Sequence, residues 1–188
     1  MLIIGDVHQK TKEYAQIISS YKESICVGDF GFKAEHLWHG ETFSPLHKVN
    51  FGNHDDPNCL DMPHSCGDFG MFGNIFTIRG AESTDKVFRH SGINWWEEEE
   101  LSYQRAMDAI SFYESCKPEI VISHDAPQRI RTNLFGIHES SFTGVLLNNL
   151  FEIHQPKLWI FGHHHRSITI TLVNTTFVCL DELDFLVI

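Results

Sequence analysis

Five short runs of hydrophobic residues in this chain are each followed by a cluster of histidine, aspartate or asparagine. The runs are Leu2–Ile4, Ile25–Val27, Ile120–Ile122, Leu158–Phe161 and the less apolar Lys48–Phe51. The clusters are Gly5-Asp6-Val7-His8, Gly28-Asp29, Gly52-Asn53-His54-Asp55, Ser123-His124-Asp125 and Gly162-His163-His164-His165. Short apolar runs of this kind are typical of buried strands. Strands that end side by side would bring all five clusters to one edge, which predicts a metal-binding pocket of imidazole, carboxylate and amide groups.

The order of predicted elements indicates an α/β fold. Strands alternate with helices in the first half, which implies parallel pairing in the sheet. The predicted helices are Thr11–Tyr21, a segment capped by Ser102 that runs to about Ser115, and Ser141 to about Ile153. Ile75–Ile78 is a further predicted strand, whereas Asn53–Asn74 is predicted to be a long loop and Ser83–Trp96 an irregular segment. Antiparallel strands around an Asn174-Thr175 turn are predicted for the tail, at Ile168–Val173, Phe177–Leu180 and Phe185–Ile188.

Composition restricts the classes of partner. The 188 residues, 42% hydrophobic and 21% charged, predict one soluble domain spanning residues 1–188. The net charge of −11 repels a phosphate backbone and disfavours extended nucleic acid, although bound divalent ions would locally reverse the sign for a small phosphate ester. Five cysteines without framework spacing predict reduced thiols. With a strand starting at Leu2 and no apolar run of about 18 residues, we expect a cytoplasmic protein without signal peptide or membrane partner.

The residue types in the clusters suit a pair of divalent ions. Each ion takes about four to six ligands, and one shared carboxylate can hold two ions about 3.5–4 Å apart. Asp29 is a lone carboxylate that suits this bridging role. Alternate residues share a face of an extended chain, which pairs Asp6 with His8 and His163 with His165. Mixed imidazole and carboxylate ligands favour manganese, with iron, zinc or nickel as alternatives.

Such an ion pair would allow hydrolysis of a phosphate ester. A water molecule bound between two ions loses its proton near neutral pH and can attack phosphorus in line with the leaving group. The leaving oxygen then needs a proton. His54 stands beside Asn53, whose neutral carbonyl oxygen suits a ligand role, and is predicted to be the catalytic acid.

The motifs, taken in order, resemble the calcineurin-like metallophosphoesterases. The resemblance rests on Gly-Asp-x-His, Gly-Asp, Gly-Asn-His-Asp, His and Gly-His-x-His, and covers the chain from Asp6 to His165. It implies an α/β/β/α sandwich of two mixed sheets flanked by helices, with metals at the carboxyl ends of the strands. It also implies one ion held by Asp6, His8, Asp29 and His165, a second ion held by Asp29, Asn53, His124 and His163, and His54 facing the leaving group.

The resemblance leaves the substrate open. A small-molecule or nucleotide phosphodiesterase or phosphatase is the first hypothesis, because the chain is short and acidic. A nuclease or a phosphoprotein phosphatase of the same family is the alternative, and a non-catalytic metal-binding scaffold is the third. The protein phosphatases of this family have Gly-Asp-x-x-Asp-Arg at the second motif, where this chain has Phe32 and Lys33. This departure leaves the partner that orients His54 unidentified, and the sequence does not fix the oligomeric state.

Three further residues are candidates for contact with substrate. Arg89 lies four residues after Asp85, a spacing that fits either an exposed helical pair or a phosphate clamp. Arg129 is a candidate for phosphate contact from a loop near the metals. His164 stands between two predicted ligands and is expected to point to the opposite face from them.

Overall fold

The computed structural model describes residues 1–31 and 43–188 and contains two sheets. The smaller sheet has the strand order β10 (Phe185–Val187), β1 (Leu2–Ile4), β2 (Ser24–Cys26) and β3 (His47–Val49). The larger sheet has the order β4 (Phe69–Phe72), β5 (Ile75–Ile78), β6 (Ile120–Ser123), β7 (Leu158–Phe161), β9 (Thr175–Cys179) and β8 (Ile168–Leu172). Both sheets are mixed, because β10, β4 and β8 run antiparallel to their neighbours while the inner pairs are parallel.

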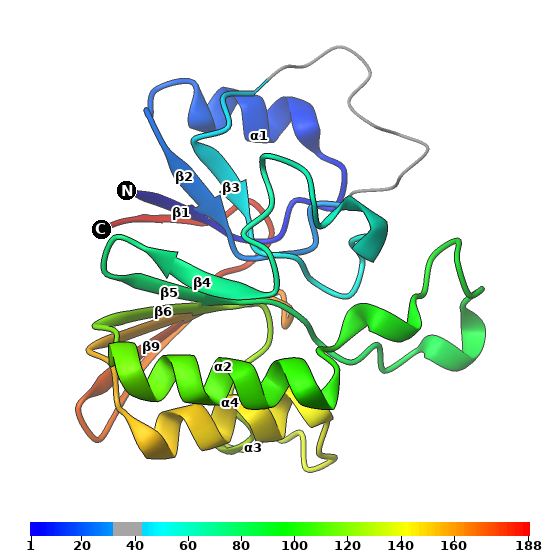
Figure 1. The fold of residues 1–188 in the computed structure, drawn as a ribbon. Helices are drawn as coiled ribbons and strands as arrows, with labels where there is room; N and C mark the ends of the chain where they lie inside the picture. Colours follow the sequence, from blue (N-terminus) through cyan, green and yellow to red (C-terminus); the bar gives the residue numbers. More distant parts are fainter. Residues whose placement is uncertain (32–42) are drawn as a thin grey trace.

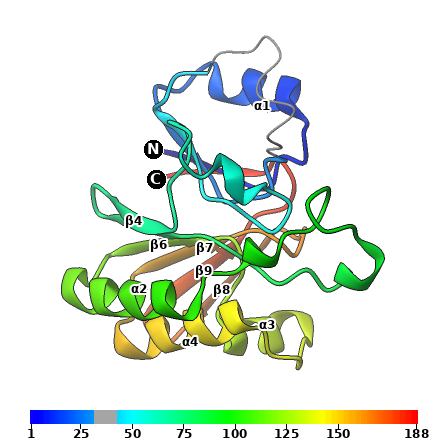
Figure 2. The same cartoon turned by 45° about the vertical axis from the view of Figure 1, so that its right-hand side comes forward.

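Helices cover the outer face of each sheet, so the molecule has four layers (Figure 1). Helix α1 covers the smaller sheet, and α2, α4 and α3 cover the larger one, as Figure 2 also shows. The helices are α1 (Thr11–Ile18), α2 (Tyr103–Cys116), α3 (Gln128–Phe135) and α4 (Phe142–Ile153), with 3₁₀ turns η2 (Pro57–Cys59), η3 (Lys86–Phe88) and η4 (Glu97–Glu99). The predicted α/β/β/α class is therefore confirmed. None of the helices in the described part of the chain has the length and apolar character needed to cross a bilayer.

Alternation along the strands assigns side chains to layers. In β1, Leu2 and Ile4 belong to the cluster that packs under α1, whereas Ile3 belongs to the cluster between the two sheets. In β7, Trp159 packs toward the helices of the larger sheet and Ile160 faces the smaller sheet. All five side chains are fully buried, so these strands are apolar on both faces. This explains why the sequence shows continuous apolar runs here instead of alternation.

The parallel strands carry the polar clusters to one edge. Strands β1, β2 and β3 are parallel to one another, as are β6 and β7, and each ends just before one of the five clusters. The two sheets also hydrogen-bond to each other beyond these strand ends, since the backbone NH of His163 donates to the side chain of Asp6. The predicted convergence at the carboxyl ends of the strands is therefore present in the fold.

Three local predictions are wrong. The segment Asn53–Asn74 is not only loop, because it contains β4, which pairs with β5 through a turn at Gly73 with φ +64. The loop predicted to carry Arg129 is instead helix α3, which Pro127 precedes and which Gly136 ends with φ +68. In the tail, β8 and β9 are antiparallel as predicted, but the last strand leaves them and pairs with β1 of the other sheet.

Several predicted boundaries are close to the observed ones. The first helix ends at Ile18 instead of Tyr21. Ser102 caps α2 as predicted, since its hydroxyl accepts from the backbone NH of Arg105 at 3.3 Å. Ser141 caps α4 in the same way, accepting from Gly144 at 2.9 Å. The sequence difference at Phe32 and Lys33 lies outside the described residues.

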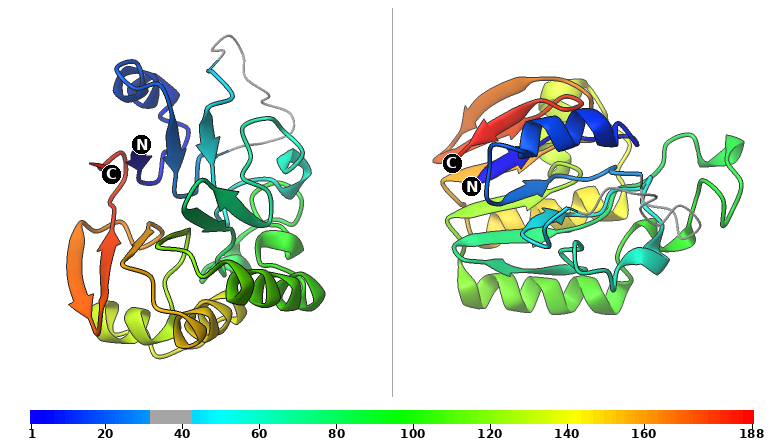
Figure 3. Two further views of the ribbon diagram at one scale, coloured as in Figure 1. Left: turned by 60° about the vertical axis from the view of Figure 1, so that its left-hand side comes forward. Right: turned by 90° about the horizontal axis from the view of Figure 1, so that it is seen from above.

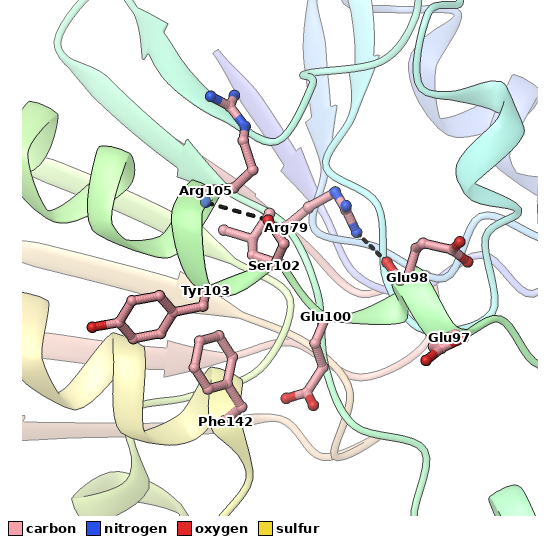
Figure 4. A pocket seen from close by; sticks show the side chains of 9 residues that line it. Arg79, Glu97, Glu98, Glu100, Ser102, Tyr103, Arg105 and Phe142 are labelled. Atoms are coloured by element: carbon pink, nitrogen blue, oxygen red, sulfur yellow. Dashed lines mark hydrogen bonds between the residues drawn. The ribbon is translucent and has the colours of Figure 1, made fainter.

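An arm formed by residues 82–96 projects from the body beside the strand ends (Figures 1 and 3). Its base is fixed to the larger sheet, because Arg79 donates to the side chain of Asp68 at 2.7 Å and to the backbone carbonyl of Glu98 at 2.8 Å. Figure 4 shows the second of these bonds, next to the start of α2. The arm leaves and re-enters the body at neighbouring points, so it can reach over the strand ends without disturbing the sheets.

One prediction concerns the glycine before the last histidine cluster. A Cβ added at Gly162 would lie 2.2 Å from Oδ1 of Asp6 and 2.7 Å from Cγ2 of Val27. We expect Gly162→Ala to lower the free energy of unfolding by about 1–3 kcal/mol, because both neighbours are buried and cannot withdraw. Gly70→Ala is the control, since a Cβ there meets no atom within 4 Å, and its stability should be unchanged or about 1 kcal/mol higher. Equal denaturation midpoints for the two variants would contradict this account.

Candidate metal centre

The first of two groups of possible ligands joins residues from both ends of the chain. The first cluster consists of Asp6, His8, Asp29 and His165, whose ligand atoms all lie within 4.8 Å of one another. Nε2 of His8 is 3.0 Å from Nε2 of His165, and the latter is 3.4 Å from Oδ2 of Asp6. Two imidazoles and two carboxylates that converge in this way form a donor set for a divalent transition metal.

The second cluster shares Asp29 with the first. It consists of Asp29, His124 and His163, again with ligand atoms within 4.8 Å of one another. Nε2 of His124 lies 3.3 Å from Oδ1 of Asp29 and 3.3 Å from the amide oxygen of Asn53, so the amide adjoins this cluster. All seven residues predicted as metal ligands thus meet at one place, with Asp29 in the bridging position. Their roles as ligands remain predictions.

The backbone at the clusters adopts a conformation that non-glycine residues seldom take. Four of the seven residues have positive φ: His8 at 45°, Asp29 at 45°, His163 at 65° and His165 at 48°. Left-handed backbone at such residues costs of order 1–3 kcal/mol each and is concentrated at functional sites. The predicted pairing of Asp6 with His8 is present, whereas that of His163 with His165 is wrong, because the chain turns at these residues instead of running extended. His163 and His165 accordingly reach different clusters.

Burial and mutual charge shift the pKa values of the buried groups at the site. Asp6 and Asp29 are both almost fully buried. Burial raises the pKa of Asp6, with the charge of His124 opposing and that of Asp29 adding to the shift. For Asp29, the charge of His124 and its hydrogen bond outweigh burial and lower the pKa. Burial lowers the pKa of His124, but Asp29 and Asp6 outweigh it and raise the pKa to about 10.

The charge balance shows what the site lacks. Without an ion, the imidazolium of His124 faces the carboxylate of Asp29, Asp6 keeps a proton because its pKa is raised to about 8, and Oδ1 of Asp6 has no hydrogen-bond partner among the described residues. His163 does not help, because burial lowers its pKa to about 3 and leaves the ring neutral. Burial keeps Asp6 from ionising without a further positive charge, so a cation at this position would take the place of its proton and satisfy the oxygen that the chain leaves without a partner.

His54 lies at the mouth of the site and has a partner from the arm. Its Nε2 is 3.9 Å from Oδ2 of Asp29, and its ring packs edge-on against that of His8 with centroids 5.2 Å apart. The guanidinium of Arg89 lies 3.2 Å from Nδ1 and 3.0 Å from Nε2 of His54, and Nε of Arg89 pairs with Asp85 at 2.6 Å. The predicted pairing of Asp85 with Arg89 is present, on a 3₁₀ turn and not an α-helix, and it is directed at the site.

Two buried aspartates fasten the loops that carry the clusters. Asp55 accepts from the backbone NH of Gly52 at 2.9 Å and of Gly31 at 2.7 Å, which ties the turn after β3 to the loop after β2. Asp125 accepts from Nε2 of His164 at 3.1 Å, which ties the loop after β6 to the loop after β7. These contacts add buried side-chain links to the backbone hydrogen bonds between the loops, such as that from Gly162 to the carbonyl of His124 at 3.0 Å.

Two of the three substrate candidates lie away from the mouth of the site. The His164 side chain is only 7% exposed and stacks on the ring of Phe135, with centroids 4.0 Å apart. Its ring also lies edge-on to that of His163, with centroids 5.1 Å apart, so it does not point away from both neighbours as predicted, and this buried position does not favour substrate contact. Arg129 is exposed at the start of α3, where its backbone NH donates to Asn148. Substrate contact by either residue remains a prediction.

Sequence reasoning missed one acidic residue at the site. Glu182 lies 3.3 Å from Nδ1 of His165 and also pairs with Lys10. A carboxylate on the far nitrogen of a histidine orients the ring and makes the near nitrogen a better donor. Glu182 follows β9 and has no motif around it, so only the register of the final strands could have placed it here.

Comparisons with known proteins agree with this geometry. The family model described as calcineurin-like phosphoesterase matches residues 1–167. No curated protein matches the sequence. Among solved structures, phosphopantetheinyl hydrolase (PptH) from Mycobacterium tuberculosis superimposes with a TM-score of 0.57 at 12% identity, covering 96% of this chain and 89% of that chain.

Two other solved structures share the fold at similar distance. GAP50, the anchor in the inner membrane complex of Plasmodium, has a TM-score of 0.52 at 12% identity, with coverage of 96% and 71%. A putative 5′-nucleotidase from Staphylococcus aureus has a TM-score of 0.51 at 14% identity, with coverage of 96% and 48%. Identities this low establish a common fold alone. The family match over residues 1–167, on a fold that gathers both clusters at its strand ends, shows that this chain belongs to the calcineurin-like phosphoesterases and is a metal-dependent phosphoric ester hydrolase.

Proposed function

We propose that this protein hydrolyses a phosphate mono- or diester of a small molecule or nucleotide with the help of two divalent ions, most readily Mn²⁺. The observation that carries the proposal is the meeting of two ligand clusters at one shared carboxylate, Asp29. A site built for one structural ion has no need of a second donor set around the same carboxylate. Paired ions are the arrangement that phosphoester hydrolysis uses.

The residues present fit such an ion pair. The donors are carboxylate oxygens, imidazole nitrogens and one amide oxygen, a mixture suited to manganese, iron or zinc. The first ion would be held by Asp6, His8, Asp29 and His165. The second ion would be held by Asp29, Asn53, His124 and His163. When bound, two divalent ions would polarise the ester and make a water molecule acidic.

The chain itself supplies the proton for the leaving group through His54. Burial lowers the pKa of His54, Asp29 opposes that shift, and the charges of Arg89 and His124 add to it. A bound phosphate anion would raise this pKa again, because negative charge favours the imidazolium. Protonation of His54 is thereby coupled to the arrival of the substrate, which is when an acid is required.

Arg89 holds the ring of His54 from the arm while that ring is neutral, since a guanidinium can only donate. Its guanidinium is held by Asp85 at 2.6 Å and by the backbone carbonyl of Asn94 at 3.2 Å. Both bonds fix the group over the ring of His54. We therefore assign Arg89 the orienting role toward His54 and a contact with a phosphate oxygen of the substrate, since a fixed guanidinium matches phosphate geometry.

The small size of the substrate follows from charge and from the mouth of the site. The mouth is a narrow pocket lined by His8, Gln9, Gly31, His54, Asn94 and Trp96. The net charge of −11 opposes the approach of a polyanion, whereas a short phosphate ester needs to reach only the ion pair. We further propose a cytoplasmic location, supported by five cysteines that are all unpaired.

The ion stoichiometry tests the division into two clusters. Wild-type protein should carry two Mn²⁺ ions per chain, measured by elemental analysis after gel filtration. Asp29→Asn should retain neither ion tightly, because the shared carboxylate is weakened in both clusters. His163→Ala removes a ligand from the second cluster alone and should retain one ion. Loss of both ions from His163→Ala, or two ions in Asp29→Asn, contradicts the assignment.

Metal binding should release protons and tighten as pH rises. The pKa values of Asp6 and His124 are raised in the ion-free protein, so protons occupy positions that an ion would take. Because each bound ion displaces protons, low pH favours the ion-free form. Calorimetric titration at neutral pH with Mn²⁺, in two buffers of different ionisation enthalpy, gives the number of protons released. A value of zero would show that the site is already deprotonated.

Removal of the proposed acid tests the reaction itself. With Mn²⁺ added, the wild-type protein should hydrolyse p-nitrophenyl phosphate, bis-p-nitrophenyl phosphate or both. His54→Ala should keep both ions and lose about 10²–10⁴-fold in kcat, with larger losses for esters whose leaving groups are more basic.

Two results would count against this proposal. Hydrolysis of neither ester by wild-type protein with two ions bound would favour a metal-holding scaffold. Loss of an ion from His54→Ala would make His54 a ligand and not the acid.

A further inference from the structure

Asn53 can serve as a ligand in only one of two orientations of its side-chain amide. The oxygen can bind a cation, whereas the NH₂ group cannot, and the two ends have nearly the same shape. In the structure Oδ1 of Asn53 faces His124, and Nδ2 points the other way and donates to the hydroxyl of Ser83 at 3.0 Å. Asn53 and Ser83 are each 2% exposed, so water cannot readily replace this bond.

The hydroxyl of Ser83 is committed to a carboxylate. Its Oγ donates to Oε2 of Glu99 at 2.5 Å, and the backbone NH of Ser83 donates to Oε1 of Glu99 at 2.9 Å. Glu99 is also buried. An ionised carboxylate can only accept, so the single hydroxyl hydrogen of Ser83 is used by Glu99. Only lone pairs of the Ser83 oxygen then face Asn53, and they accept the NH₂ group and reject the amide oxygen.

We propose that Glu99 and Ser83 are positioning residues that hold the amide of Asn53 with its oxygen toward the second cluster. Asn53 donates to Ser83 and Ser83 donates to Glu99, so the hydrogen bonds all point in one direction. This direction fixes the amide of Asn53 with its oxygen toward the second cluster before any ion binds. This assignment rests on the proposed function, because it concerns the ion that Asp29, Asn53, His124 and His163 would hold.

We call the hydrogen bonds from Asn53 through Ser83 to Glu99 the relay. The backbone around the relay brings these three residues together. Gly80 has φ +103, and a Cβ there would lie 2.9 Å from the backbone oxygen of Glu99, so the two segments pass as close as backbone allows. The NH of Gly80 donates to the carbonyl of Phe51 at 3.0 Å, which ties the same segment to the loop that leads from β3 to Asn53. Arg79 holds the carbonyl of Glu98, the residue before Glu99 (Figure 4).

Glu99→Gln tests the relay without changing its shape. The glutamine oxygen must accept from the NH of Ser83, so its NH₂ group faces Ser83 Oγ and donates to it. The hydroxyl hydrogen of Ser83 is then no longer used by residue 99 and is free to donate to the oxygen of Asn53, which turns the NH₂ group of Asn53 toward the ion. We expect the affinity of the second Mn²⁺ ion to fall about 10–100-fold, as is common when a partner behind a ligand is lost. The first ion should bind as in wild type, measured by titration followed with electron paramagnetic resonance.

Two variants separate this effect from a general structural role. Glu98→Gln makes the same change at the neighbouring exposed residue and should leave both affinities unchanged. Asn53→Asp in the Glu99→Gln background has an oxygen at both positions, so it should restore binding of the second ion. If Glu99→Gln does not fold, Ser83→Ala provides the test, because it removes the hydroxyl that accepts from Asn53. It should lower the affinity for the second ion severalfold, whereas Ser83→Thr, which keeps the hydroxyl, should bind the ion as wild type does.

The outcomes are distinct. Unchanged binding of the second ion in folded Glu99→Gln, or no recovery with Asn53→Asp, overturns the relay and leaves the proposed function intact. Equal weakening of both ions would also overturn it, because the fault would then lie in the fold. Wild-type protein that binds fewer than two ions would overturn the proposed function, and the relay with it.

Discussion

The burial of two carboxyl groups side by side, Asp6 and Asp29, is the constraint on which the site depends. The protein cannot hydrate these groups, and the imidazolium of His124 supports only one of them as a carboxylate, so the pKa of Asp6 is raised and it keeps a proton until a cation replaces it. Each hydrophobic layer is needed to create this shortage, because the sheets and helices exclude water from the strand ends. The packing that stabilises the fold therefore also raises the affinity of the site for cations. Affinity for metal depends on the whole architecture and not on the ligands alone.

Space at the site is controlled by glycines and by strained backbone. A Cβ added at Gly28 or Gly52 would lie within about 2.5 Å of His124 or Asp29. Only glycine, which has no side chain, therefore fits at these two positions between the clusters. Positive φ angles at His8 and His163 turn side chains that would otherwise follow the strand direction. The strain is tolerated because neighbouring hydrogen bonds over-determine these loops, such as the bond from the NH of His163 to Asp6.

Much of this could be predicted from the sequence, because buried parallel strands are apolar on both faces and their polar ends stand out. The seven predicted ligands and the layered fold follow from that pattern together with a family resemblance. The parts that escaped depend on register and tertiary contact. Strand β4 is short and half-buried, Glu182 reaches His165 only because the final strand crosses to the other sheet, and the role of Ser83 depends on hydrogen-bond polarity that no spacing encodes.

The first cluster joins residues that are 157 positions apart, since His8 and His165 meet at 3.0 Å. An ion bound there would act as a cross-link that closes most of the chain into a loop. Because the unfolded chain cannot hold these ligands together, the binding energy would add to the stability of the whole fold. The metal would then stabilise the fold as well as take part in the reaction, and a protein deprived of metal would be more prone to unfolding and proteolysis.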